Sequence, residues 1–251
     1  MLVHTRYILN KITVTNLGSI DYQAAWDLQE QLLQQAVTAK RQRMAEDEGV
    51  QAPAHHLLFC EHPLVYTLGK SGQESNLLIS DTQLAEGHIQ YVKTNRGGDI
   101  TFHGPGQLVG YPILDLEQFF TDIGKYLRFL EEITIRTLAD YGITGLRSPG
   151  ETGVWLDPGT PQARKICAMG VRCSRWVTMH GFALNVNTEM RYFDNIIPCG
   201  ITDKKVTSLE QELGRKVPMD EVRGRMIKYF GEVFDAVIVE SAPNSVITTF
   251  A

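Results

Sequence analysis

Residues 96–116, RGGDITFHGPGQLVGYPILDL, join a glycine-rich segment to an apolar run that has the character of a strand. Four glycines fall within the first eleven residues, and glycine lets a backbone adopt positive φ angles and approach a ligand closely. Polar side chains lie beside this backbone, namely those of Arg96, Thr101, His103 and Gln107. These residues alone leave two interpretations open: a turn between two strands, or the wall of a ligand-binding pocket.

Two nucleotide-binding motifs fail in this part of the chain. Gly104-Pro105-Gly106 resembles the start of a dinucleotide fingerprint, but Val109 to Ile113 continue as a strand. That fingerprint must open a helix, because the helix N-terminus binds the pyrophosphate. Gly69-Lys70-Ser71 resembles the end of a phosphate loop, yet Leu64 occupies the position at which that loop needs glycine.

The flanking sequence predicts strands and helices that are mixed without regular alternation. Apolar runs and alternating patterns predict strands over 11–18, 56–60, 65–69 and 89–93, and two more within 163–187, joined by a turn at 173–175. Helical spacing predicts helices from Asp21, over 122–141, from a capping box of Thr207 and Glu210, and after a cap at Asp220. The charged stretch 40–54 is interpreted as a solvated loop or insertion after the first helix.

This pattern predicts an α+β fold for the whole chain, 1–251, as a single domain with its core over about 10–235. We expect a mixed, largely antiparallel sheet flanked by helices. The 251 residues are 43% hydrophobic and 21% charged, an ordinary globular balance, and the net charge is −5. An acidic chain argues against a general nucleic-acid binder. No apolar stretch has the length of a membrane span or the form of a signal peptide, so a reduced, cytoplasmic protein is expected.

Four side chains near one strand are possible metal ligands: His55, His56, Cys60 and His62. A zinc site is usually completed by a second pair of cysteines or histidines at a short spacing, and the sequence offers none. We therefore expect no metal site.

The four cysteines differ in their surroundings. Cys60 and Cys167 fall in apolar strand patterns, where cysteine usually acts as a small buried hydrophobe, and Cys173 falls in the expected turn. Cys199 lies between Pro198 and Gly200, on a tight loop. A nucleophilic cysteine needs a base or a cation that favours its thiolate. The candidates for that partner are Lys165, His103 and His180.

Several segments together resemble a known family. They are EHPLVYTLG (61–69), the glycine-rich stretch 96–116, ETGVWL (151–156), RKICAMGVR (164–172), HGFALNVN (180–187) and IIPCGI (196–201). In order and spacing they resemble the octanoyltransferases of lipoate biosynthesis over about residues 10–235.

The resemblance implies a fold shared with lipoate-protein and biotin-protein ligases. It implies transfer of an octanoyl or lipoyl group from acyl carrier protein to a lysine of apo lipoyl domains, those of 2-oxoacid dehydrogenases and the glycine cleavage protein. No nucleotide or other cofactor would be needed, because the donor is already a thioester. Neither nucleic acid nor a membrane is an expected partner. The family's nucleophile matches Cys199 and its acid/base lysine matches Lys165.

The family's acyl-binding residues also have matches in this chain. They fall on Arg96, Gly97, Gly98, Asp99, Ile100, Thr101, Phe102 and His103, on Ala168, Met169 and Gly170, and on Gly181, Phe182 and Ala183. Phe102 and Met169 are expected to line a tunnel for the acyl chain.

Two alternatives differ in chemistry. An ATP-dependent lipoate-protein ligase on the same fold would activate a free acid and would not need Cys199. A non-catalytic acyl-binding or carrier-docking protein would need neither Cys199 nor Lys165. Residues 164–216 carry nine lysines or arginines against five acidic residues, and we expect this basic segment to meet an acidic carrier protein.

Overall fold

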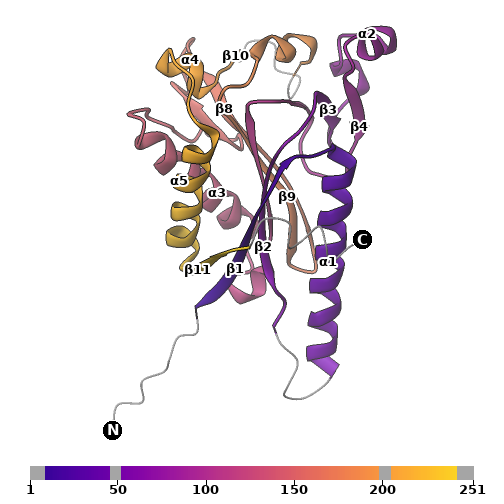
Figure 1. The fold of residues 1–251 in the computed structure, drawn as a ribbon, viewed down its shortest axis with the longest axis vertical. Helices are drawn as coiled ribbons and strands as arrows, with labels where there is room; N and C mark the ends of the chain where they lie inside the picture. Colours follow the sequence, from indigo (N-terminus) through magenta and orange to yellow (C-terminus); the bar gives the residue numbers. More distant parts are fainter. Residues whose placement is uncertain (1–8, 46–51, 198–204, 242–251) are drawn as a thin grey trace.

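The computed structural model describes residues 9–45, 52–197 and 205–241. An eight-stranded sheet runs through the centre of the molecule (Figure 1). Its strand order is β10 (Lys205–Val206), β8 (Arg164–Ser174), β9 (Val177–Asn185), β6 (Gln107–Ile113), β2 (His55–Glu61), β1 (Asn10–Ser19) and β11 (Ala236–Glu240), and β7 (Val154–Leu156) pairs with β8.

The sheet is mixed. The β7–β8, β8–β9, β9–β6 and β6–β2 pairs are antiparallel, whereas β1 is parallel to both β2 and β11, and β10 is parallel to β8. This confirms the α+β class and the largely antiparallel sheet flanked by helices.

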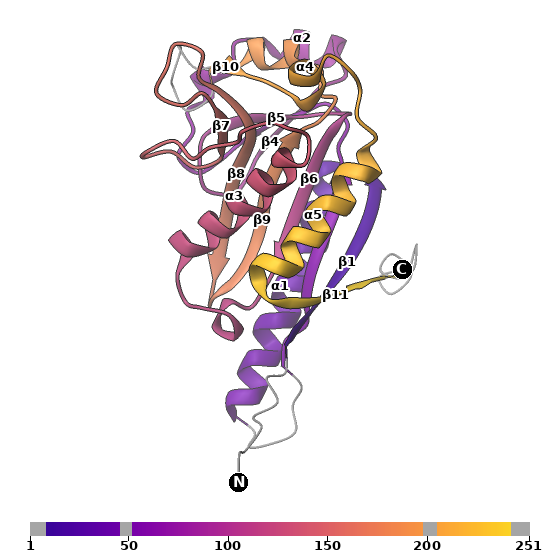
Figure 2. The same cartoon turned by 90° about the vertical axis from the view of Figure 1, so that its left-hand side faces the viewer.

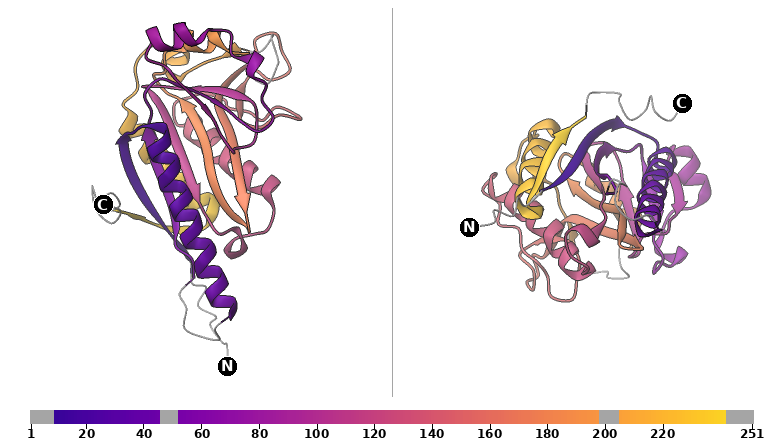
Figure 3. Two further views of the ribbon diagram at one scale, coloured as in Figure 1. Left: turned by 90° about the vertical axis from the view of Figure 1, so that its right-hand side faces the viewer. Right: turned by 90° about the horizontal axis from the view of Figure 1, so that it is seen from below.

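Helices cover both faces of the sheet (Figures 2 and 3). On one face α1 (Tyr22–Ala45) packs against β6 and β9, and on the other α3 (Ile123–Ala139) packs with α5 (Met219–Phe234). Alternation along the strands builds two cores, because successive side chains point to opposite faces. In β2, for example, Leu57 and Phe59 join the core beneath α3 and α5, whereas Leu58 and Cys60 join the core beneath α1.

A second, three-stranded sheet lies at one end of the main one (Figure 1). It consists of β4 (Gln90–Lys93), β3 (Val65–Leu68) and β5 (Ile100–His103), followed in the chain by β6 of the main sheet. It has its own apolar core, which includes Tyr66, Phe102 and Phe193. The glycine-rich segment therefore joins the two sheets. Two short helices, α2 (Asp81–Glu86) and α4 (Leu209–Leu213), lie at the same end.

The predicted loop over 40–54 begins too early. Helix α1 continues to Ala45, and Lys40 is buried on it. Lys40 Nζ lies 2.6 Å from Asp115 Oδ1 and donates to Arg175 O at 2.7 Å. The charge pattern was interpreted as solvated, but a long lysine stem can cover apolar surface while its ammonium reaches a distant carboxylate.

Three local details also differ from the sequence-based expectation. Ser208, not Thr207, caps α4 and accepts the N–H of Gln211. Helix α5 begins directly after Pro218, so Asp220 lies in its first turn instead of capping it. The β8–β9 hairpin turns at 175–176, which leaves Cys173 within β8.

The chain also forms a strand that the sequence analysis did not predict. Strand β11 follows α5 and pairs in parallel with β1 at the edge of the main sheet. Within the described residues, no helix is long and apolar enough to cross a bilayer.

Candidate active site

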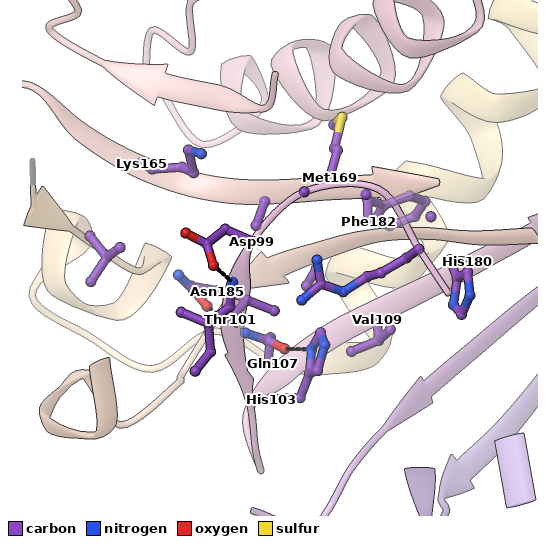
Figure 4. A pocket seen from close by; sticks show the side chains of 18 of the residues that line it. Asp99, Thr101, His103, Gln107, Val109, Lys165, Met169, His180, Phe182 and Asn185 are labelled. Carbon is purple, nitrogen blue, oxygen red and sulfur yellow. Dashed lines mark hydrogen bonds between the residues drawn. The ribbon is translucent and has the colours of Figure 1, made fainter. Parts of the chain in front are cut away.

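A pocket lies where the glycine-rich segment passes over β6, β8 and β9 (Figure 4). It holds about 820 Å³ of space, including its open mouth. Its lining consists of Tyr22, Arg96, Gly98, Asp99, Ile100, Thr101, His103, Gln107, Val109, Tyr111, Lys165, Ala168, Met169, Gly170, His180, Gly181, Phe182, Ala183, Asn185, Phe193 and Val206.

Small residues on adjacent strands make room for the pocket. Ala168 pairs with Ala183 and Gly170 pairs with Gly181 across β8 and β9, and Val109 of β6 lies beside Ala183. Such side chains leave an open, largely apolar floor. The floor suits an extended alkyl chain, because each buried methylene contributes about 0.8 kcal/mol.

The glycine-rich segment contacts β8 closely. Gly97 donates its N–H to Val171 O at 3.0 Å. A Cβ placed on Gly170 would lie 2.7 Å from Gly97 O, so this crossing requires glycine at 170. Arg96 is 8% exposed, and its Nη2 donates to Thr67 O at 2.6 Å and to Thr67 Oγ1 at 2.9 Å. The guanidinium is thereby held against the small sheet.

Lys165 and His180 occupy opposite ends of the pocket (Figure 4). His180 pairs with Val171, six residues beyond Lys165 on β8, so the strand separates the two positions by roughly 20 Å. At the lysine end, Lys165 Nζ lies 4.6 Å from the centre of the Trp155 ring. The pocket therefore has one end with a primary amine and one end with aromatic and imidazole side chains.

His103 is neutral in this pocket. Gln107 donates its amide N–H to Asn185 Oδ1 and Phe102 O, so its Oε1 accepts from His103 Nδ1 at 2.7 Å. The proton therefore sits on Nδ1 of the imidazole. Burial lowers the pKa of His103 to about 3, helped by the neighbouring His62 ring.

His180 is neutral as well. Its pKa falls to about 3, first through burial and then through the charges of Arg96 and Arg172. Its Nε2 lies 2.6 Å from Asn95 Oδ1. Of the three candidate partners for a thiolate, both histidines thus lack a positive charge near neutral pH, which leaves Lys165 as the candidate cation.

Aromatic residues that the sequence analysis did not single out complete the histidine end. Tyr22 of α1 stacks on His103 with ring centres 5.8 Å apart, and it lies edge-on to His62 at 5.2 Å. Tyr111 donates its hydroxyl to His62 Nε2 at 2.7 Å, and His62 Nδ1 donates to Ile20 O at 2.8 Å. Alternation along β6, which places 107, 109 and 111 on one face, is the sequence signal that points to Tyr111.

His62 thus uses both ring nitrogens in hydrogen bonds rather than facing a metal ion. Across residues 9–45, 52–197 and 205–241, the His, Cys, Asp and Glu side chains form no group of three or more that could hold one.

Most of the predicted acyl-binding residues line this pocket, but Gly97 and Phe102 lie outside the lining. The expectation that Phe102 lines a tunnel is wrong. Its ring stacks on Tyr192 with centres 5.0 Å apart and packs against Phe193 at 5.4 Å, in the core of the small sheet. Along β5, Thr101 and His103 face the pocket, so Phe102 between them faces away.

Cys199 lies outside the described residues. The other three thiols are poor nucleophiles. Burial raises the pKa of Cys60 above its usual range and that of Cys167 to about 12. Cys173 is half-buried, and burial raises its pKa too. Because the thiolate is the reactive form, none of these three is prepared for attack.

Comparison with known proteins identifies the family. The family described as Lipoyl protein ligase A/B catalytic domain matches residues 21–231. An octanoyltransferase of Flavobacterium psychrophilum is 61% identical over 233 residues, which cover 92% of this chain and 100% of that protein. The chain belongs to the octanoyltransferase family. A second octanoyltransferase, of Christiangramia forsetii, is 60% identical over 91% of this chain and 98% of its own length.

The fold of this octanoyltransferase family member is also similar to a solved structure. A bi-partite lipoate protein ligase of Thermoplasma acidophilum superposes with a TM-score of 0.67 at 16% identity, covering 96% of this chain and 90% of that chain. This confirms the predicted ligase-like fold.

Proposed function

We propose that this octanoyltransferase takes its acyl group from acyl carrier protein and passes it to a lysine of an apo lipoyl domain through a thioester on Cys199. The observation that carries the proposal is the pocket itself. Its small-residue floor suits an eight-carbon chain, and Lys165 lies at one end. Its relatives are named octanoyltransferases, which supports an octanoyl group as the transferred group and acyl transfer as the reaction.

The proposed chemistry has two steps. The Cys199 thiolate attacks the carbonyl of the donor thioester, and the carrier's thiol leaves with a proton. The amine of the target lysine then attacks the new thioester, an amide forms, and the Cys199 thiolate leaves. Lys165 gives and takes the protons in these steps.

Backbone N–H groups of the glycine-rich segment stabilise the tetrahedral oxyanion in this proposal. The Gly97 N–H already donates to Val171 O, so other amides of the segment must serve. The first step exchanges one thioester for another of similar energy, and the second converts a thioester into an amide of lower energy. Neither step therefore requires a nucleotide or a metal.

Two features favour Lys165 over the pocket histidines as the proton partner, and Cys199 over the other cysteines as the nucleophile. Burial lowers the pKa of His103 and of His180 to about 3, so these histidines supply no positive charge near neutral pH and are weak bases. The thiols of Cys60, Cys167 and Cys173 have raised pKa values. Cys199 is the remaining cysteine of the chain.

The lipoyl domains would be those of 2-oxoacid dehydrogenases and of the glycine cleavage protein. For the donor, an acidic carrier protein suits a basic rim near Lys165. Ion pairs reduce the basic segment considerably, since Arg164 pairs with Glu212 and Arg172 with Glu30. Lys205 is exposed on β10, which pairs with the start of β8 beside Lys165, and Arg215 and Lys216 are exposed after α4.

Turnover assays test the proposal against the ligase alternative. Octanoyl-carrier protein and an apo lipoyl domain should give octanoylated domain without nucleotide, and Cys199→Ser should lose most of this rate while folding normally. Free octanoate with ATP should give no product. Efficient ATP-dependent transfer from octanoate, retained in Cys199→Ser, would establish a ligase instead. A binding protein would give no product with either donor.

A further inference from the structure

A buried tryptophan contacts the proposed acid/base lysine across two strands. Trp155 of β7 pairs with Lys165 of β8, so both side chains project from the same face of the sheet. Lys165 Nζ lies 4.6 Å from the ring centre, and Trp155 is 3% exposed. This geometry is that of a cation–π contact, for which tryptophan is the strongest aromatic partner.

The tryptophan is not explained by apolar packing. Its neighbours Val154 and Leu156 belong to the core beneath α3 and α5, and alternation turns Trp155 to the opposite side. Among the described residues, Trp155 belongs to none of the three apolar cores. A large buried indole is thus directed at the lysine end of the pocket.

The backbone around Trp155 is fixed from several sides. Trp155 donates its N–H to Leu146 O at 2.9 Å and accepts the N–H of Leu146 at 2.8 Å. Two residues earlier, the Gly153 N–H donates to the fully buried carboxylate of Glu131 at 3.0 Å. Gly153 has a φ of +115°, and a Cβ there would lie 2.5 Å from Cys167 O, so this approach requires glycine.

We propose that Trp155 is a positioning residue that holds the Lys165 ammonium at the reactive end of the pocket. The inference rests on the proposed role of Lys165 as the proton partner of Cys199. A lysine side chain has many rotamers, and a fixed aromatic face restricts them while favouring the charged form. A held ammonium stabilises the thiolate better than a mobile one.

Other charged groups lie in the same pocket or on neighbouring strands. Asp99 and Arg96 line the same pocket, Lys205 belongs to the adjacent strand β10, and Glu131 lies behind β7. Cys167 lies two residues along β8, and the charge of Lys165 acts on its thiol. All of these groups are retained when Trp155 alone is replaced, so a changed pH midpoint of Cys199 reactivity in a Trp155 variant reports the loss of the Trp155 side chain.

The test is the pH dependence of Cys199 alkylation by iodoacetamide, followed by peptide mapping so that other thiols do not contribute. Trp155→Leu should raise the pH at which Cys199 alkylation is half-maximal, the midpoint of the profile, by roughly half to one pH unit. Trp155→Phe, which keeps a weaker aromatic face, should raise this midpoint by less. Trp176→Leu is the matched control, because it removes an indole at the far end of β8 and should leave the midpoint unchanged. A purely structural role would lower the rate at every pH without moving the midpoint.

Lys165→Ala separates failure of the inference from failure of the proposed function. If Lys165→Ala leaves the midpoint unchanged, Lys165 is not the partner of Cys199 and the proposed function fails at that residue. If Lys165→Ala raises the midpoint but neither Trp155 variant does, or if Trp176→Leu raises it equally, the positioning role of Trp155 is wrong. Should Trp155→Leu not fold, Trp155→Phe decides alone, and an unshifted midpoint there overturns the inference.

Discussion

In the proposed mechanism, Lys165 supplies both a positive charge and proton exchange from one side chain. It lines the pocket, and the proposed acid/base role falls on this amine because pKa values of about 3 make the imidazoles of His103 and His180 weak bases. Lysine releases a proton far more readily than arginine, whose guanidinium stays charged. This difference separates an electrostatic role from a proton-transfer role.

Lys165→Ala is therefore expected to slow acylation and aminolysis by about 100-fold or more, the usual scale of general acid–base catalysis. Lys165→Arg should restore little of that rate, since it returns the charge alone. Single-turnover measurements of each step check this. Recovery of most of the rate in Lys165→Arg would make Lys165 an electrostatic partner only.

The buried histidines make stability depend on pH. A pKa of about 3 in the folded state lies below the unfolded value near 6.5, so between these limits the unfolded chain binds more protons. Stability is thus fully present above pH 6.5 and declines as the pH falls toward 3. Between pH 6.5 and pH 5, protonation of each histidine in the unfolded chain should lower the free energy of unfolding by about 1 to 2 kcal/mol.

Urea unfolding at pH 7 and pH 5 tests this for His103. The His103→Gln variant should lose less stability between these two pH values than the unaltered chain. Replacement of the exposed His88 by Gln is the control and should keep the full loss. Equal losses in all three proteins would contradict a neutral, buried His103.

At the scale of elements, the end of α1 is anchored by a buried ion pair. The side chains of Lys40 and Asp115 are 9% and 4% exposed, and they join the helix to the loop after β6. Removing one partner leaves the other charge buried without compensation, which typically costs 3–5 kcal/mol.

Lys40→Met should accordingly lower the free energy of unfolding by about 3 kcal/mol. Arg41→Met, on the exposed side of the same turn, should change it by less than about 0.5 kcal/mol. Chemical denaturation measures both. A loss in Lys40→Met no larger than in Arg41→Met would show that the pair contributes nothing.

Most strands and helices were predictable because their patterns are local. The strands expected at 56–60, 65–69 and 89–93 occur within one or two residues of those bounds. Strand β11 could not be predicted from its local pattern, since its pairing partner β1 lies more than 200 residues away in the chain. The buried state of Lys40 was missed for the same reason, because Asp115 is distant in sequence.

Over the whole molecule, the motifs contain most of the described residues that line the pocket but do not show which way each side chain faces. Whether a β5 side chain faces the pocket or the small core is settled by pairing with β3, so Phe102 was misplaced. Tyr22 has helical spacing typical of a core residue, and His62 belonged to a possible metal cluster. Only the packing of α1 against β6 and β9 brings the Tyr22 ring to the pocket, where it contacts His62 and His103.

The distribution of charge over the molecule predicts where the carrier docks. Reversing Lys205, Arg215 and Lys216 to Glu together should lower kcat/KM for octanoyl-carrier protein by about tenfold at low salt, mainly through association. It should leave kcat/KM for a small octanoyl thioester unchanged. Lys11→Glu, an exposed position at the start of β1 and outside the segment 164–216, is the control. Equal loss with both donors, or with the control, would reject this docking surface.

The proposed transfer depends on a covalent acyl-enzyme at Cys199, which intact-mass analysis detects. The protein is mixed with octanoyl-carrier protein alone, without nucleotide or lipoyl domain, and the modified peptide is then mapped. We expect one added octanoyl group, located on Cys199, that disappears when apo lipoyl domain is added. An adduct on Cys60, Cys167 or Cys173, or octanoyl transfer that proceeds with no adduct at any cysteine, would contradict it.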